Sequence, residues 1–185
     1  MNTPSHQNIK AIGLAGLLAA TLAACSQSSP AGATLGIDGE EGPWSILTGP
    51  SEDGTADARF NAHGVATAVA LRAHDGDRLV EVYSTFLGGA SDPVFLQQKV
   101  SYRDASGTIF ERTGSRAGDE SDSGIRWDRL ELEPEEGSGY GAVVLDLPVC
   151  VDHYTGPLEY ETRCHQVKGQ IRASLSHDPL LRMQP

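Results

Sequence analysis

The chain is poor in basic residues. Fourteen Lys and Arg stand against 25 Asp and Glu among 185 residues, which gives a formal net charge of −11. Nucleic-acid binding requires a basic surface that neutralises phosphates, so this composition excludes DNA and RNA as expected partners. The same deficit argues against a domain that lies flat on anionic lipid. A solvated acidic surface that aids solubility is the simplest interpretation, and attraction to a cationic partner is compatible with it.

The signature motifs of the common enzyme classes are also missing. The sequence has no Gly-x-Ser-x-Gly elbow, no Cys-x-x-Cys, no His-Glu-x-x-His, no phosphate-binding loop and no dinucleotide fingerprint. Histidines are scattered, and the acidic residues are too numerous for one acid/base pair to be singled out. The sequence therefore favours a non-enzymatic protein without a cofactor, and it leaves a hydrolase as a less favoured alternative.

Long hydrophobic runs are confined to the N-terminus and are short even there. Residues 11–20 are apolar or glycine and follow a polar segment whose only formal positive charge is Lys10. This order is typical of a secretory signal. A membrane-spanning helix needs about 20 apolar residues, so an uncleaved anchor is less favoured. The run closes with Leu22-Ala23-Ala24-Cys25, a tetrapeptide that resembles the lipobox of bacterial lipoproteins.

This resemblance implies that residues 1–24 are a cleaved signal peptide and that Cys25 carries a diacylglycerol and an N-acyl chain. Several acyl chains together anchor a protein stably in the lipid bilayer. The residue that follows Cys25 is Ser26 and not Asp. This resembles the sorting pattern of lipoproteins that Gram-negative bacteria direct to the outer membrane. We therefore expect a location in its inner leaflet, facing the periplasm, with surface exposure as an open alternative. Residues 25–42 are rich in Gly, Ser and Pro and are expected to form a flexible tether.

Cysteine is scarce, with three in the chain. Once Cys25 is assigned to lipid, Cys150 and Cys164 remain, and an even pair in an oxidising compartment predicts one disulfide. The alternative is a zinc site built from these two cysteines with His153 and His165. Their spacing lacks a paired-ligand clamp, and the adjacent Cys164 and His165 would point to opposite faces of a strand.

Helical periodicity is absent from the mature chain, and alternation with a period of two dominates from Val65 onward. Turn signals recur about every ten residues, as in antiparallel β-folds. The chain is therefore predicted to be all-β, with an antiparallel β-sandwich (Ig-like or transthyretin-like) of about 7–8 strands over residues 43–178 and a C-terminal tail over residues 179–185. A small closed β-barrel is the alternative.

Several local expectations follow from the same patterns. Residues 44–47 are a candidate edge strand, and residues 49–58 are expected to form a loop. Pro148 is expected to end a strand, and residues 158–164 and 166–175 to form the closing hairpin. Gly169 is expected to mark a bulge or a close approach of another strand.

An acidic loop and the aromatic residues are the remaining candidates for binding sites. Residues 119–124 resemble the opening of a calcium-binding EF-hand loop, with oxygen side chains at the first, third and fifth positions and Gly at the sixth. The twelfth position, which needs a bidentate Glu, is Leu130, so Asp119, Ser121 and Asp122 are only weak metal candidates. The aromatic residues are more typical of a core than of a ligand cleft. They are Trp44, Tyr83, Tyr102, Trp127, Tyr140, Tyr154 and Tyr160.

Together these features predict a lipid-anchored protein of the cell envelope whose β-domain contacts another, unidentified envelope protein and does not catalyse a reaction. Two alternatives from other classes stay open. One is a binder of calcium or of a small ligand, and the other is an inhibitor of a cationic enzyme. The sequence does not choose between them.

Overall fold

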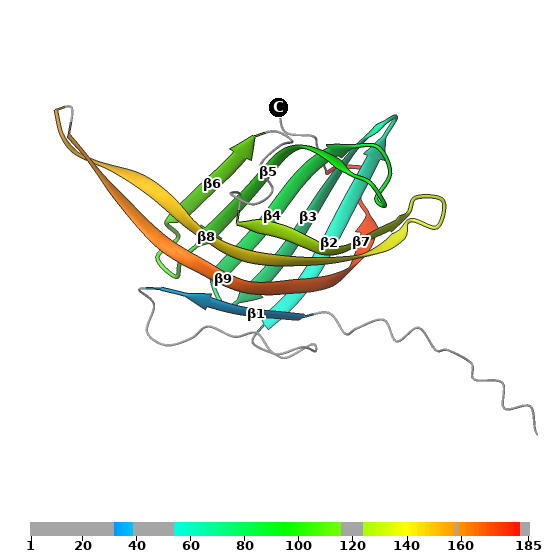
Figure 1. Ribbon diagram of the computed structural model, residues 1–185. Helices are drawn as coiled ribbons and strands as arrows, with labels where there is room; N and C mark the ends of the chain where they lie inside the picture. Colours follow the sequence, from blue (N-terminus) through cyan, green and yellow to red (C-terminus); the bar gives the residue numbers. More distant parts are fainter. Residues whose placement is uncertain (1–31, 39–53, 116–123, 158, 182–185) are drawn as a thin grey trace, which may run out of the picture.

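The protein is built from β-strands stacked in two layers. The computed structural model describes residues 32–38, 54–115, 124–157 and 159–181 (Figure 1). These residues form nine strands and no helix long and apolar enough to cross a membrane. The strands are β1 (Gly32–Ile37), β2 (Gly54–His63), β3 (Ala66–Asp75), β4 (Arg78–Leu87), β5 (Val94–Arg103), β6 (Ile109–Ser115), β7 (Ile125–Glu133), β8 (Ser138–Gly156) and β9 (Glu159–His177).

Each layer is a set of neighbouring strands. Strands β2 to β6 pair antiparallel in chain order and form the first layer. The second layer has the order β1-β9-β8-β7, also antiparallel. Figure 1 shows the long strands β8 and β9 crossing the strands of the first layer at a large angle. The two layers can therefore bury one face each against the other.

Two short contacts join the layers into a ring. Residues 58–60 of β2 pair in parallel with residues 175–177 of β9, and Glu111 of β6 pairs with Cys150 of β8. The predicted all-β, sandwich-like fold is confirmed. It differs in detail from the prediction, because the sheet is mixed and nine strands are present in place of seven or eight.

The core lies between the two layers. Alternate residues of each strand point inward, as the period of two predicted, and the largest fully buried side chains come from both layers. They include Phe60, Leu71, Phe86, Tyr102, Phe110, Leu145, Leu147 and Ile171. Burying a side chain of this size contributes about 1.5–3 kcal/mol, so this interface is the main source of stability.

Residues 32–37, which the sequence analysis placed in the flexible tether, form strand β1. They pair with residues 167–172 of β9, and Ala33, Leu35 and Ile37 are at most 5% exposed. The prediction was wrong because glycines and a threonine separate these apolar residues, so the alternation is short and the composition resembles a linker. Strand β2 likewise begins at Gly54, inside the predicted loop. The candidate strand at residues 44–47 lies outside the described residues.

Strand β8 runs through Pro148, where a strand end was expected. Cys150 and Cys164 are direct partners whose Cα atoms lie 4.1 Å apart, the close spacing of a non-hydrogen-bonded pair. Hydrogen-bonded and non-hydrogen-bonded pairs alternate along an antiparallel ladder, so Pro148, two residues from Cys150, is also in a non-hydrogen-bonded pair. Its backbone nitrogen therefore points away from β9. On that side β7 pairs with β8 as far as Leu145, and β6 meets β8 only at Cys150. The ladders of the described strands therefore need no N–H at Pro148.

The predicted closing hairpin is also corrected. Residues 159–177 are one strand, β9, which pairs with β8 from Ser138↔Ser176 to Gly156↔Glu159. The hairpin is thus made by two strands of 19 residues each. It is much longer than a strand of the other layer, and this excess length produces the site described below.

Gly169 lies where β1 approaches β9 most closely. Its φ angle is +144°, and a Cβ atom at this position would lie 2.0 Å from the carbonyl oxygen of Thr34. The predicted close approach is confirmed. Glycine is required here because a side chain would push β1 away from the sheet.

We expect Gly169→Ala to lower the free energy of unfolding by about 3 kcal/mol, because the added methyl group collides with backbone atoms of β1 and the φ angle disfavours alanine. The measurement is urea denaturation. Gly64→Ala is the matched control, since Gly64 also has a positive φ (+62°) but a Cβ there would meet nothing within 4 Å. Its cost should be about 1 kcal/mol. Equal losses in the two variants would contradict the close approach of β1.

Candidate interaction site on the β8–β9 arm

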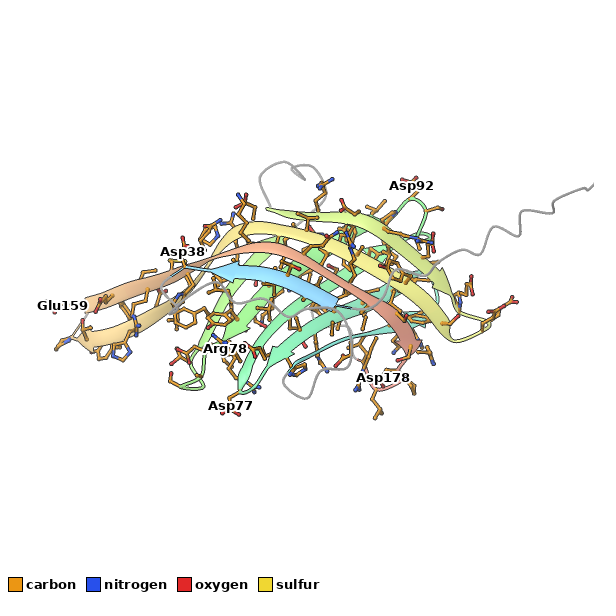
Figure 2. The ribbon with its side chains drawn as sticks, turned by 90° about the horizontal axis from the view of Figure 1, so that it is seen from below. Asp38, Asp77, Arg78, Asp92, Glu159 and Asp178 are labelled. Carbon is orange, nitrogen blue, oxygen red and sulfur yellow. A yellow bond between two sulfur atoms is a disulfide. The ribbon has the colours of Figure 1, made fainter. Side chains whose placement is uncertain are left out.

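The ends of β8 and β9 project from the body of the protein as a two-stranded arm. We define the arm as residues 152–157 and 159–163. Each of these residues is exposed except Gly156, which is half-buried. Figure 1 shows the arm extending past the first layer, and Figure 2 places Glu159 at its tip. At about 3.4 Å per residue, the five residues 152–156 extend about 17 Å beyond Val151, the last residue of β8 that packs on the core.

One face of the arm, here called the disulfide face, carries three successive cross-strand pairs. Nearest the body is the Cys150–Cys164 disulfide. Next, the hydroxyl of Thr162 donates a 2.7 Å hydrogen bond to Asp152. Farthest out, the rings of Tyr154 and Tyr160 meet edge to face, with centroids 5.5 Å apart. Such pairs stabilise a hairpin that has no third strand beside it.

The disulfide closes the root of the arm on this face. The cysteines bond to each other as predicted, and Cys150 also pairs with Glu111 of β6. The covalent link therefore lies where β8, β9 and the first layer meet. A two-stranded hairpin is only marginally stable in water, and a cross-link at its root limits how far the strands can separate.

The opposite face of the root is braced by His165. Its ring packs edge-on against Phe110 and Tyr102 of the first layer, at centroid distances of 4.4 and 5.5 Å. Its Nδ1 lies 2.5 Å from the carbonyl oxygen of Asp38, so Nδ1 carries the proton and donates this bond. The neighbouring Cys164 lies on the other face, as the sequence predicted, and the two cannot share one metal ion.

The aromatic residues divide into two groups. Tyr83, Tyr102 and Tyr140 are buried, in agreement with the expectation of a core role. Trp127 is partly buried and stacks on the Phe95 ring, with centroids 6.2 Å apart. The exceptions are Tyr154 and Tyr160, which are 58% and 67% exposed. Neither ring belongs to the core, and each packs against the other, so the core interpretation does not apply to them.

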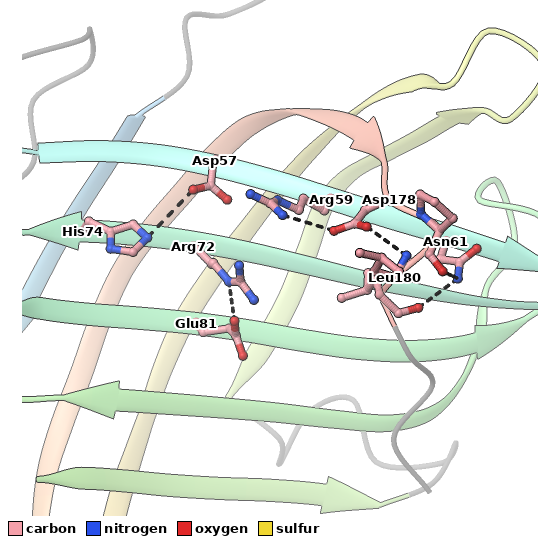
Figure 3. Close-up of polar contacts among 10 residues, drawn as sticks. Asp57, Arg59, Asn61, Arg72, His74, Glu81, Asp178 and Leu180 are labelled. Atoms are coloured by element: carbon pink, nitrogen blue, oxygen red, sulfur yellow. Dashed lines mark hydrogen bonds and ion pairs between the residues drawn. The ribbon is translucent and has the colours of Figure 1, made fainter. Parts of the chain in front are cut away.

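A second polar cluster lies on the outer face of the first layer (Figure 3). Arg72 of β3 pairs with Glu81 of β4, and Nε2 of His74 lies 3.8 Å from Asp57 of β2. These contacts cross neighbouring strands, so Arg72 and His74 each have a carboxylate beside them. The arrangement stabilises strand pairing.

The same cluster attaches the start of the C-terminal tail. Arg59 forms a 3.1 Å ion pair with Asp178, and Asn61 donates a 2.8 Å hydrogen bond to the carbonyl of Leu181. A backbone hydrogen bond from Leu180 and the Arg59 guanidinium hold the pKa of Asp178 below its ordinary value of 3.8. Leu181 packs on a small apolar cluster of β3 and β4. These contacts fasten residues 178–181 to the sheet.

The structure does not describe the remaining predicted site residues. Cys25 and the metal candidates Asp119, Ser121 and Asp122 lie outside the described residues. Within the ranges that the structure describes, no group of three His, Cys, Asp or Glu side chains is arranged to hold a metal ion.

No family model matches the chain, and it has no significant similarity to a curated protein or to a solved structure. The arm is therefore interpreted from its own geometry. One signal in the sequence could have located the arm. In residues 152–164 the alternation of apolar and polar residues stops, so both faces of the strands are polar, yet the run contains two tyrosines.

We expect the double substitution Cys150→Ser/Cys164→Ser to lower the free energy of unfolding by about 3 kcal/mol, the loop-closure value for a loop of about 15 residues. The measurement is urea denaturation under non-reducing conditions. The matched control is Asp152→Ala/Thr162→Ala, which removes the next cross-strand pair without cutting a covalent link and should cost about 1 kcal/mol or less. A cysteine variant as stable as this control would show that the disulfide does not constrain the chain.

Proposed function

We propose that this protein is a lipid-anchored protein of the cell envelope that binds another protein through the β8–β9 arm and does not catalyse a reaction. The observation that carries the proposal is the exposed pair Tyr154 and Tyr160 on an arm that contributes nothing to the core. Tyrosine is enriched at protein interfaces, where its ring supplies apolar area and its hydroxyl a hydrogen bond.

The contacts that hold the root of the arm support a role in binding. Its root is cross-linked on one face by the disulfide and braced on the other by His165. Ordering a flexible segment on binding costs conformational entropy, so a segment that is already ordered binds more tightly for the same contacts. An arm built only to cap the sheet would not need to extend past the last core residue.

The position of the N-terminal strand is compatible with an anchor at one end and a partner at the other. Gly32 begins β1, seven residues after Cys25, and pairs with Arg172 of β9. Tyr160 lies twelve residues earlier on β9, about 40 Å away when measured along the strand. Seven residues span at most about 25 Å. An acylated Cys25 would thus hold the body close to the bilayer while the arm remains accessible.

The lipid anchor is tested by metabolic labelling with radioactive palmitate in a Gram-negative host. We expect label on the wild-type protein and on Cys150→Ser/Cys164→Ser, and none on Cys25→Ala, because the diacylglycerol is attached through the sulfur of Cys25. Mass spectrometry should find a mature chain that begins at residue 25. Label retained by Cys25→Ala, or a wild-type chain with residues 1–24 intact, would contradict the anchor.

The contact through the arm is tested by replacing Tyr160 with a photo-crosslinking phenylalanine analogue in the full-length protein. Illumination of intact cells should give one adduct of defined mass. The matched control carries the same analogue at Asp77, an exposed turn residue between β3 and β4, and should give none. Adding Tyr154→Ser to the Tyr160 probe should reduce the adduct about tenfold, as expected for the loss of an interface anchor. The absence of an adduct from the arm would refute this role.

A further inference from the structure

We infer that the surface which receives the arm is a basic groove on a second protein. This inference rests on the proposed function and adds the chemistry of the partner. It follows from two properties of the arm, its unbalanced charge and the distribution of its side chains over two faces.

The arm carries an excess of carboxylates that the basic side chains of the described residues do not neutralise. Asp152, Glu159 and Glu161 stand against a single guanidinium, Arg163, which gives a formal charge of −2. Among the described residues neither Glu159 nor Glu161 has an ion-pair partner. His153 lies opposite Glu161 across the strands, and it is the only other titratable side chain on that face apart from Arg163 and Glu159.

Two carboxylates near the root of the arm, by contrast, are paired with a lysine. Asp146, at the body end of the same hairpin, pairs with Lys168 at 2.9 Å, and Glu111 pairs with Lys99 at 2.6 Å. The Lys168 and Gln166 side chains hold the pKa of Asp146 below its ordinary value. Glu159 and Glu161 have no such cation beside them on the arm, so their charge is available to a partner.

The two faces of the arm present different groups. Tyr154, Tyr160 and Asp152 share the disulfide face, whereas Glu159 and Glu161 lie on the opposite one, because residues alternate along a strand. A flat partner surface would cover one face and leave the other in water. A groove contacts both, and a two-stranded arm is narrow enough to enter one, since its strands lie about 4.8 Å apart.

Basic side chains can bind the carboxylates on one face of the arm and the tyrosine rings on the other. A guanidinium binds a carboxylate through two parallel hydrogen bonds and also stacks on the face of a tyrosine ring. A second copy of this chain is the less suitable occupant, because two arms of charge −2 repel each other, as do two domains whose mature chains are both acidic.

The test reverses charge at the arm and at a matched distant position. The photo-crosslinking analogue stays at Tyr160, and yields are compared for the parent, Glu159→Lys/Glu161→Lys and Glu135→Lys/Glu136→Lys. The control pair is equally exposed and lies in the turn before β8, at the opposite end of the same hairpin. Both variants change the net charge by the same amount. A shared melting temperature confirms that both are folded.

We expect the arm reversal to lower the adduct yield and the association rate with the purified partner about tenfold at low ionic strength, and the control to leave both within about twofold. The difference should shrink as salt screens the charges. Peptide mapping should place the adduct beside Lys and Arg residues of the partner. An adduct that forms equally with the reversed arm, maps to an acidic or flat surface, or has the mass of two copies of this chain would overturn the basic groove while leaving arm-mediated binding intact. No adduct at all would instead refute the proposed function.

Discussion

The pairing of β8 with β9 is the constraint on which the rest of the structure depends. Along one edge β8 and β9 pair with each other, and along its other edge each strand pairs with two further strands. Strand β9 holds β1 along residues 167–172 and β2 along residues 175–177, and β8 holds β7 and meets β6. Both joints between the layers therefore run through this hairpin. Any shift of its register by one residue would turn the buried faces of both strands outward.

The arm is a consequence of the same hairpin. The layers cross at a large angle, so a strand of the second layer spans the first layer only over part of its length (Figure 1). Beyond Val151 no strand of the first layer lies beneath β8, and alternation of apolar and polar residues ends there. The chain compensates with a disulfide, a hydrogen bond and an aromatic pair, each linking the two strands directly. Charged side chains on the outer face of β2 to β4 form ion pairs within the sheet. Glu159 and Glu161 of the arm have no ion-pair partner among the described residues, so they can bind another molecule.

Sequence patterns predicted the features that depend on local alternation and on simple counting. The all-β class followed from the period of two, and the Cys150–Cys164 bond from two cysteines left after the assignment of Cys25. The patterns failed where a distant strand decides the outcome. Strand β1 was taken for a linker because its apolar residues become informative only when β9 is beside them. Pro148 was taken for a strand end because its position between β7 and β6, where no N–H is needed, is a property of the assembled sheet. Leu181 gave no sign that it would pack on β3 and β4.

By itself, the sequence determined the all-β class, the disulfide pairing and the acidic character of this protein, since these depend on side-chain alternation, cysteine number and charge. Only the tertiary structure decided that β8 and β9 extend past the core. The sequence patterns ended one of these strands at Pro148 and divided the other, so their full length emerged only in the folded sheet. The place where burial stops is set by the crossing angle of the two layers, and the sequence of one strand does not determine that angle. For the same reason, the exposure of Tyr154 and Tyr160 distinguishes them from the buried tyrosines only in the folded protein.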